Sequence, residues 1–328
     1  MLVVDHDEKF LGTITDGDIR RSLINKSNMD TKLHKIMCKN PTTGTINDNH
    51  RDLSKIIEQR DLTAIPILDD NKKIINLLTI NCNTKDEKLD NTVLLLAGGF
   101  GKRLGSLTSK TPKPLLNVGD KPIIETIIQQ LIKYNFKNFI ISSHFKSKML
   151  IDHLGSGESL GVNIEHIFEE KPLGTAGSLG LIEKLPNDKP LIVMNADLLT
   201  AVNFESLLQF HEKNNVQATI CAQEHIYQIP FGKLVVQNHR LQSIEEKPKE
   251  KSFINAGIYV LEPEVLKYVA KNTYLDMPDL LSLIISNENE IAVFPIHEYW
   301  LDIGKIEDFQ KGQKDYFEKF RDKTPKKQ

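Results

Sequence analysis

Residues 91–116, NTVLLLAGGFGKRLGSLTSKTPKPLL, place a glycine-rich loop directly after a short apolar segment, and no other feature constrains the fold as strongly. The apolar segment, residues 92–97, consists of β-branched and aliphatic side chains and ends at glycine, which is typical of a strand buried on both faces of a parallel sheet. Gly98, Gly99 and Gly101 then allow a sharp turn and bring backbone N–H groups close to an anion, because no Cβ intervenes. This order predicts an anion site at the end of a buried strand.

Two cations follow the loop. Arg103 and Lys113 add charge that is not expected in a strand or in the core, and Pro112 and Pro114 stiffen the backbone around the lysine. A P-loop requires G-x-x-x-x-G-K-[ST] and a dinucleotide-binding turn requires G-x-G-x-x-G, and this segment has neither spacing. Loop and cations together predict a triphosphate site. The alternative is a glycine-rich turn with solvated basic residues.

Residues 96–104, LAGGFGKRL, together with PKP at 112–114, resemble the signature of the sugar-1-phosphate nucleotidylyltransferases, GGxGTRLxPLTxxxPKP. The chain departs from this form at Lys102, where the family mostly has threonine, and at Gly105, where it mostly has proline. The resemblance reaches about residue 310 and implies catalytic roles for Arg103 and Lys113. The nucleotide-binding residues that it implies in the loop are Leu96, Ala97, Gly98, Gly99 and Gly101.

The remainder of the chain alternates apolar strand-like and helix-like segments, which predicts an α/β fold with parallel strands. Isoleucine and leucine at helical spacing over residues 123–132 follow Pro122, a residue suited to a first helical turn, and residues 139–141 and 191–194 are expected to be buried strands. The resemblance implies, more specifically, a Rossmann-like mixed, mostly parallel sheet of the nucleotide-diphospho-sugar transferase type.

A second motif, residues 170–178, has the sequence EKPLGTAGS. In the family this segment passes under the nucleotide base, and its PLGTAG form resembles that of guanylyltransferases such as mannose-1-phosphate guanylyltransferase, which favours GTP. The alternative, a closely packed helix N-terminus, accounts for the first glycine but gives no reason for Gly177. The nucleotide-binding residues implied here are Gly174, Thr175, Ala176 and Gly177.

Two aspartates are expected to hold Mg²⁺. Asp197 follows the strand at 191–194, and a carboxylate at a strand end is a hard oxygen ligand of the kind that Mg²⁺ prefers. Its expected partner is Asp302 in WLDIG, which matches the W-x-D-I-G of the family. Alone, each would more often be a cap or turn residue. A D-x-D motif, usual in glycosyltransferases of related type, is absent after Asp197.

A third segment carries the expected sugar-phosphate pocket. By resemblance, Lys247 in IEEKP holds the sugar phosphate and Glu246 accepts sugar hydroxyls, while Gly232 and Asn255 line the pocket. A run of solvated charged residues explains Lys249 and the two residues after it equally well.

The predicted reaction is attack of a sugar-1-phosphate oxygen on the α-phosphorus of a triphosphate. Catalysis is expected to depend on neutralising the phosphate charges and aligning the substrates, without a protein nucleophile. Two alternatives stay open, a catalytically silent subunit that binds sugar nucleotides and a cytidylyltransferase acting on a non-sugar phosphate.

The polar segment around residues 83–91 predicts a linker, giving domains at 1–82 and 92–320 and a flexible basic tail at 321–328. The first domain contains two similar units of strand, acidic turn and strand, and GTITDGDIRR at 12–21 resembles a cystathionine-β-synthase-type (CBS) pair whose first repeat is incomplete. That resemblance implies adenine-nucleotide contacts at Thr15 and Asp18. An incomplete pair exposes strand edges, so we expect this domain to promote a homo-oligomer.

Composition narrows the function further. The 328 residues include 42 Lys and Arg against 44 Asp and Glu, so nothing favours nucleic acid or a membrane surface as partner. No apolar run approaches the roughly 20 residues needed to span a bilayer, and a cytoplasmic location is expected. The three cysteines lack metal-ligand spacing and are expected to be reduced.

Overall fold

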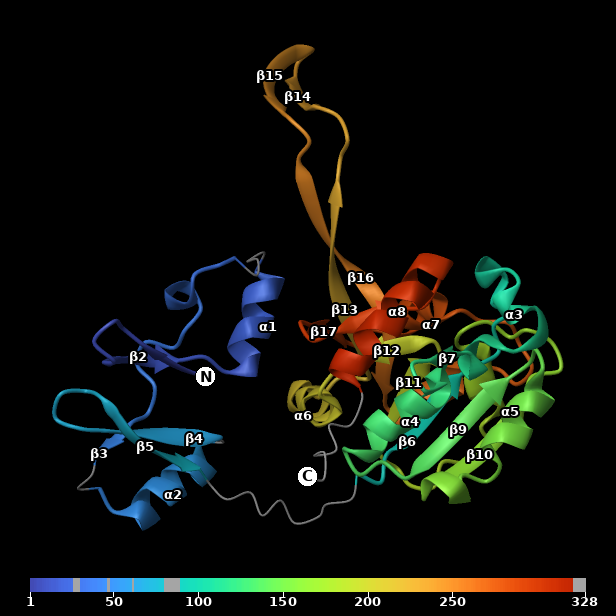
Figure 1. Ribbon diagram of the computed structural model, residues 1–328, viewed down its shortest axis with the longest axis horizontal. Helices are drawn as coiled ribbons and strands as arrows, with labels where there is room; N and C mark the ends of the chain where they lie inside the picture. The colour runs from blue at the N-terminus through green and yellow to red at the C-terminus, as the bar shows by residue number, and fades with distance from the viewer. Residues whose placement is uncertain (26–29, 46–47, 61, 80–88, 321–328) are drawn as a thin grey trace. The chain divides into compact units, whose positions relative to one another are not determined.

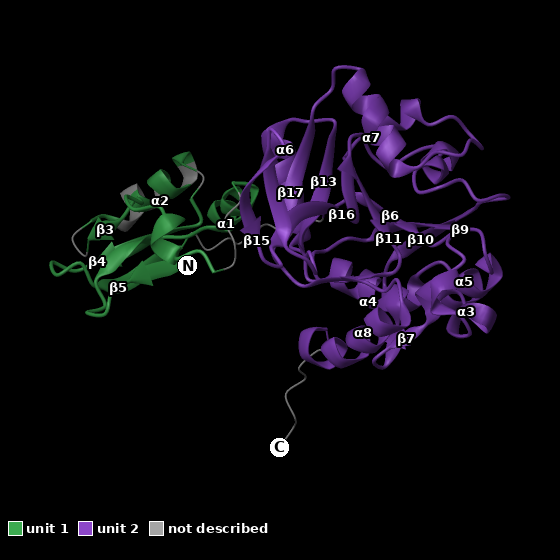
Figure 2. Ribbon diagram, turned by 90° about the horizontal axis from the view of Figure 1, so that it is seen from above, with its two compact units in different colours: residues 1–87 green, residues 88–328 purple. Residues whose placement is uncertain are grey.

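The computed structural model describes residues 1–25, 30–45, 48–60, 62–79 and 89–320. The chain divides into two compact units, Met1–Glu87 and Lys88–Gln328 (Figure 2). Most of the linker predicted at 83–91 and all of the predicted tail at 321–328 lie outside the described residues. Within the described part of the chain, no helix is both long and apolar enough to cross a membrane.

The first unit repeats one arrangement twice, as the sequence predicts. Each copy is a pair of antiparallel strands, β1 (Leu2–Val4) with β2 (Phe10–Thr13) and β4 (Ala64–Leu68) with β5 (Ile74–Thr79). An aspartate at the start of each turn, Asp5 or Asp69, accepts hydrogen bonds from the backbone N–H groups two and four residues later, at 2.7 to 2.9 Å. The acidic turns therefore close in the same way.

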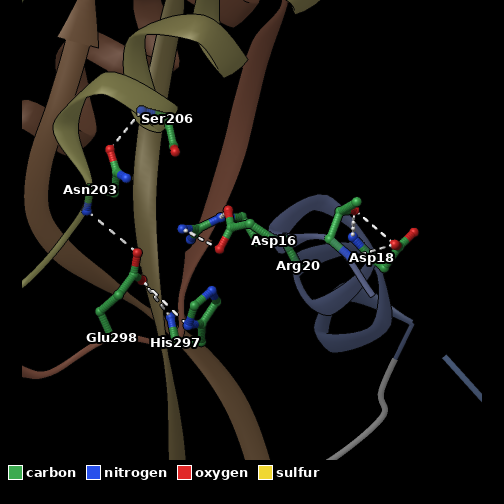
Figure 3. Close-up of polar contacts among 8 residues, drawn as sticks. Asp16, Asp18, Arg20, Asn203, Ser206, His297 and Glu298 are labelled. Atoms are coloured by element: carbon green, nitrogen blue, oxygen red, sulfur yellow. Dashed lines mark hydrogen bonds and ion pairs between the residues drawn. The ribbon is translucent and has the colours of Figure 1, made fainter. Parts of the chain in front are cut away.

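A threonine–aspartate pair lies at or just before the start of each α-helix that the structure describes in this unit. Before α1 (Asp16–Ile24), Thr15 Oγ1 accepts from the Asp18 backbone N–H at 3.2 Å, and the Asp18 carboxylate accepts from the Thr15 N–H at 2.8 Å (Figure 3). Before α2 (His50–Gln59), Asp48 accepts from the Thr45 N–H at 2.6 Å. Thr15 and Asp18, the residues implied as a CBS ligand site, therefore cap a helix, and nucleotide binding there stays a prediction. The unit is completed by η1 (Leu33–Lys35) and by β3 (Gly44–Thr45), which pairs in parallel with β4.

The second unit is built on a seven-stranded sheet of order β10-β9-β6-β11-β16-β13-β17 (Figure 1). Only β16 pairs antiparallel with its neighbours, which confirms the predicted mixed, mostly parallel sheet. The strands are β6 (Thr92–Leu96), β9 (Asn138–Ser143), β10 (Asn163–Phe168), β11 (Leu191–Asn195), β13 (Ala218–Gln228), β16 (Lys249–Leu261) and β17 (Ile291–Ile296).

The predicted strand after residue 91 is buried on both faces, as expected. Val93 and Leu95 belong to the core cluster on one face, and Leu94 belongs to the cluster on the other, because successive side chains of a strand point to opposite faces. The first cluster includes residues of α4 (Ile123–Ile132), α5 (Ser147–Leu154), α6 (Phe204–Asn214) and α8 (Ile306–Lys319). The second includes residues of η5 (Gly177–Leu181), η6 (Pro263–Tyr268) and α7 (Met277–Ser286).

Short elements complete this unit. Two small antiparallel pairs join β7 (Asn117–Val118) to β8 (Lys121–Pro122) and β12 (Leu198–Thr200) to β18 (Trp300–Asp302). Near the glycine loop lie η2 (Lys102–Leu104), α3 (Leu107–Lys110) and η3 (Lys113–Leu115), and η4 (Glu158–Leu160) precedes β10. At the start of α6 the Asn203 side chain accepts from the Ser206 N–H at 2.9 Å, and Glu298 accepts from the Asn203 N–H at 3.4 Å (Figure 3).

A long ribbon projects from the sheet. The outer halves of β13 and β16 pair only with each other and lead to a hairpin of β14 (Lys233–Gln237) and β15 (Arg240–Glu245), which stands at the far end of the ribbon (Figure 1). We call residues 223–254 the arm. Every residue of β14 and β15 is exposed.

Candidate active site

The glycine loop and the first aspartate leave the sheet side by side. Leu96, the last residue of β6, is in register with Asn195, the last residue of β11, and the Ala196 N–H donates to the Leu96 carbonyl at 3.0 Å. Gly98 to Gly101 and Asp197 follow these strand ends. In an open α/β sheet, ligands bind in the crevice at the carboxyl ends of the strands, so the predicted nucleotide loop and the predicted metal ligand lie where a ligand is expected.

The backbone conformation explains why one residue of the loop, Gly101, is a glycine. Gly101 has φ +63°, in the left-handed region, and a Cβ there would lie 2.8 Å from Thr108 Cγ2. Thr108 also donates its hydroxyl to the Gly101 carbonyl at 2.9 Å. Gly99 differs, because a Cβ added to it would meet no described atom within 4 Å. The backbone at Gly99 is therefore open on the side where a ligand could approach.

The pairing of β12 with β18 brings the two predicted metal ligands together. Leu198 is in register with Asp302, and the Ile303 N–H donates to the Asp197 carbonyl at 3.1 Å. The Lys113 ammonium forms an ion pair with Asp197 Oδ2 and lies 3.7 Å from Asp302 Oδ1. Residues more than 180 positions apart in the sequence thus form one cluster of two carboxylates and a lysine.

The burial of Lys113 differs from what the sequence predicted. Its charge was predicted to lie outside the core, but the residue is only 8% exposed and is held against both carboxylates. Burial is tolerated because an ammonium group paired with carboxylates keeps its charge compensated. Arg103, by contrast, is exposed, and its Nη1 lies 3.5 Å from the position that a Cβ on Gly304 would occupy, close to Asp302.

The hydrogen bonding of this cluster is incomplete. Among the described residues, no group donates a hydrogen bond to Asp197 Oδ1 or Asp302 Oδ1, although both atoms are buried. Burial, and then repulsion from Asp197, raises the pKa of the Asp302 carboxyl, while Lys113 and Arg103 act in the opposite direction. Two buried carboxylate oxygens that accept no hydrogen bond from the described residues supply the hard ligands that a divalent cation takes. The residues present therefore fit the predicted metal.

The PLGTAG segment packs against residues 273–277. The N–H groups of Ala176 and Gly177 both donate to the Leu275 carbonyl, at 2.9 and 3.0 Å, and the Thr175 N–H donates to Asp276 at 3.1 Å. A Cβ on Gly177 would lie 2.5 Å from the Thr273 carbonyl. Close packing thus gives Gly177 a structural reason that the sequence did not reveal. Gly174, at φ +80°, is equally confined.

Glu169 joins the glycine loop to the PLGTAG segment, and the sequence did not single it out. It is 5% exposed, accepts from Ser142 Oγ at 2.7 Å and from the Leu173 N–H at 3.1 Å, and its Oε1 lies 3.0 Å from where a Cβ on Gly98 would be. A signal was available in the chain, because Glu169 follows a strand end as Asp197 does.

Only one of the predicted sugar-phosphate residues lies near the aspartates. Asn255 borders a bulge of β16, where a Cβ on Gly257 would lie 2.6 Å from Asn195 Nδ2 and where Trp300 Nε1 donates to the Ala256 carbonyl at 2.9 Å. Gly232, Glu246 and Lys247 instead lie on the exposed part of the arm. The structure brings Asn255 to the crevice and leaves the other three residues away from it.

Known proteins resemble the second unit. Residues 92–319 match the family model described as Nucleotidyl transferase. The mannose-1-phosphate guanyltransferase of Yarrowia lipolytica is 33% identical over 239 residues, covering 71% of this chain and 66% of that protein. The enzyme of the same name from Debaryomyces hansenii is 33% identical over 242 residues, covering 71% and 67%. The chain thus spans about two thirds of the length of these relatives.

A solved structure shares the fold. HddC from Yersinia pseudotuberculosis, crystallised with GMP-PN, aligns with a TM-score of 0.55 at 23% identity, covering 69% of this chain and 99% of that one. The family match covers the whole crevice, from the glycine loop to Asp302. The sequence resemblance to sugar-1-phosphate nucleotidylyltransferases of the guanylyltransferase type is confirmed, and the chain belongs to the nucleotidyl transferase family.

Proposed function

We propose that the second unit is an enzyme that transfers GMP from GTP to a sugar 1-phosphate and releases pyrophosphate and a GDP-sugar. The observation that carries this proposal is the cluster of Asp197, Asp302 and Lys113 beside an open glycine loop. Retention of these groups argues against a catalytically silent subunit. A cytidylyltransferase acting on a non-sugar phosphate is the remaining alternative, and the guanyltransferase relatives disfavour it.

The reaction joins two anions. A phosphate oxygen of the sugar 1-phosphate attacks the α-phosphorus of GTP, a new P–O bond forms, and the bond from the α-phosphorus to the bridging oxygen breaks with departure of pyrophosphate. Positive charge and in-line alignment therefore dominate catalysis. The exposed Arg103 guanidinium and the backbone N–H groups of the glycine loop bind the phosphates, and Lys113 stabilises the charge that develops as the bridging bond breaks.

A divalent metal ion is the general requirement of this family, and we assign Mg²⁺ to Asp197 and Asp302. The support is the pair of buried carboxylate oxygens without a hydrogen-bond donor. When bound, Mg²⁺ neutralises phosphate charge beside the attacked phosphorus. Lys113 already lies between the carboxylates, so this side chain keeps the crevice charge compensated and the carboxylates oriented.

Three observations support guanine as the base. Both relatives described above are named mannose-1-phosphate guanyltransferases, and PLGTAG has the guanylyltransferase form. Glu169 adds a chemical reason, because guanine carries adjacent N1–H and N2–H donors, and a carboxylate only accepts. Uracil and thymine each present a single donor between two carbonyl acceptors. A buried carboxylate between the two nucleotide loops therefore suits guanine better.

Pyrophosphate release measured with GTP, UTP, dTTP, CTP and ATP, each against a panel of sugar 1-phosphates that includes mannose 1-phosphate, tests the proposal. GTP should give the highest kcat/KM, because an unpaired polar group in a site built for guanine raises the barrier for other bases. Equal or faster turnover with UTP would show that the base assignment is wrong. Turnover of phosphocholine with CTP, and of no sugar phosphate, would establish the alternative.

A further inference from the structure

The three residues that follow β9, at 144–146, contact both the glycine loop and the short helix α3 after it. Strand β9 lies beside β6, with Ser142 in register with Leu96, so the chain leaves both strands at the same edge of the sheet. The sequence of this segment is HFK, and the sequence motifs did not single it out. We call residues 144–146 the brace.

The lysine of the brace binds the end of α3. The Lys146 ammonium group donates hydrogen bonds to the carbonyls of Thr108 and Ser109, at 3.2 and 2.6 Å. The last carbonyls of a helix have no partner within the helix, and a lysine side chain can supply one. Thr108 in turn donates its hydroxyl to the Gly101 carbonyl at 2.9 Å. Lys146 is therefore linked through one residue to the left-handed glycine of the loop.

The backbone of Lys146 is in a conformation that favours glycine. Its φ is +56° and its ψ is +35°, in the left-handed region, where a Cβ is unfavourable. A lysine in this conformation requires contacts that compensate the strain. The side chain makes the two hydrogen bonds to α3, and its ammonium group lies 4.7 Å from the centroid of the Phe145 ring. These contacts give a reason for a lysine where glycine would fit the backbone better.

The two rings of the brace pack against the loop itself. Phe100, between the second and third glycines of the loop, lies edge to face with His144 and tilted to Phe145, with ring centroids 5.7 and 5.5 Å apart. Aromatic pairs at such distances are favourable. His144 Nδ1 also donates to the Glu169 carbonyl at 2.7 Å. The brace thus connects the glycine loop, α3 and the residue that we expect to accept hydrogen bonds from the base.

We propose that Lys146 is a positioning residue for the triphosphate. Through α3 and Thr108 it holds the glycine loop in the conformation that presents backbone N–H groups to the phosphates, while the rings of the brace hold Phe100. A glycine-rich loop has many conformations, and ordering it on binding would cost affinity unless it is held beforehand. The identity of the ligand rests on the proposed function, whereas the holding of the loop does not.

Initial rates separate positioning from a general loss of stability. Lys146→Met keeps the aliphatic stem and removes the ammonium group, so it should raise the KM for GTP by about 10-fold, as expected for one lost hydrogen bond to a charged group. The kcat and the KM for the sugar phosphate should change little. Lys146→Arg keeps a cationic donor and should recover most of the affinity, and Lys148→Met, at an exposed position of α5, is the control. An unchanged KM for GTP in Lys146→Met overturns the proposal.

A double-mutant cycle tests whether Lys146 acts through α3. Thr108→Val removes the hydrogen bond to the Gly101 carbonyl and nearly preserves the side-chain volume. If the two residues act in series, the double variant of Thr108→Val and Lys146→Met should raise the KM for GTP no more than the worse single variant, because coupled residues are not additive. A rise equal to the product of the two single effects overturns the proposal.

Amide hydrogen exchange tests the loop without GTP and without activity. The Leu104 N–H donates to the Gly101 carbonyl at 3.0 Å, and this bond should open more often in Lys146→Gly, so its exchange should accelerate by about 10-fold. The melting temperature should stay close to that of the wild type, because glycine suits the left-handed backbone at this position. Exchange at the wild-type rate overturns the proposal. If the wild type releases no pyrophosphate from any triphosphate, the proposed function fails, and this measurement still decides whether Lys146 holds the loop.

Discussion

Asp197 and Asp302 set the chemistry of the crevice at the scale of single residues. Both carboxylates pair with Lys113, and each also has a buried oxygen to which no described group donates a hydrogen bond, so these oxygens can still bind a metal ion. We expect Asp197→Asn and Asp302→Asn each to lower turnover by about 10²-fold or more. Because each substitution also removes a partner of the buried Lys113 ammonium, the melting temperature should fall as well, and chelation of divalent metal should mimic the loss of turnover. Asp188→Asn, at an exposed position, is the control. Full activity in excess chelator would refute the metal assignment.

Glu169 is the residue that we expect to accept hydrogen bonds from the guanine base. Glu169→Gln keeps the side-chain volume but replaces one acceptor oxygen with an NH₂ donor. That donor would face either the Leu173 N–H or the N–H groups of guanine, and two donors cannot form a hydrogen bond with each other. A hydrogen bond to a charged group contributes about 1.5 to 3 kcal/mol, so kcat/KM for GTP should fall by roughly 10- to 100-fold. The KM for the sugar phosphate should change little. Unchanged kinetics with GTP and ITP would remove Glu169 from the site.

At the scale of elements, the two nucleotide loops require glycine for different reasons. Gly177→Ala places a Cβ 2.5 Å from the Thr273 carbonyl and should destabilise the second unit by about 1 to 3 kcal/mol, as overpacking does. Gly99→Ala meets no described atom within 4 Å, so its melting temperature should match the wild type while its KM for GTP rises. Thermal unfolding and initial rates separate the two. A strongly destabilised Gly99→Ala variant would contradict this division.

Helix α6 is attached to the sheet through a buried histidine. His211 contacts Thr219 Oγ1 at 2.8 Å and Glu262 Oε1 at 3.1 Å, and burial lowers its pKa, an effect that Glu262 opposes. The folded state thus binds a proton less readily than the unfolded state. The stability that this neutral histidine contributes is complete above the unfolded pKa and is lost as the pH falls through that value toward the lower folded pKa.

His211→Asn should therefore flatten the acid side of the stability profile, in addition to its loss of packing. The difference in slope should not exceed about 1.4 kcal/mol per pH unit, the limit for one proton. Melting temperatures measured from pH 5 to pH 8 provide the check, with exposed His239→Asn as control. If the melting temperature of the variant falls with decreasing pH as steeply as that of the wild type, groups other than His211 cause the acid sensitivity.

The whole molecule combines a catalytic unit with a unit of repeated strands. Every proposed catalytic residue lies in Lys88–Gln328, so a chain lacking residues 1–87 should keep its nucleotidyl transfer. We predict that it also forms smaller assemblies than the full chain in light scattering, because the first unit is expected to promote a homo-oligomer. An inactive but folded shortened chain would place part of the active site in the first unit. Adenine-nucleotide binding at Thr15 and Asp18 is measurable on the full chain by calorimetry.

Much of the crevice follows from local sequence. A buried strand, a glycine loop and a carboxylate at a strand end depend on the backbone and on nearest neighbours, so the positions of Gly101 and Asp197 could be predicted. The same holds for the helix after Pro122 and for the acidic turns at Asp5 and Asp69. These features need no knowledge of which distant segments meet.

The other features of the crevice depend on contacts between segments that are far apart in the sequence. Lys113 is buried because β12 and β18 bring Asp197 and Asp302 to it, and Gly177 is confined because residues 273–277 pack on it. The sequence contains no local trace of either contact. The motif at Glu246 and Lys247 was recognised from sequence, but only the pairing of β13 with β16 places it on the exposed part of the arm. Sequence determined which groups the protein carries, and the register of distant strands determined where they stand, because charge and hydrogen-bond compensation act through space.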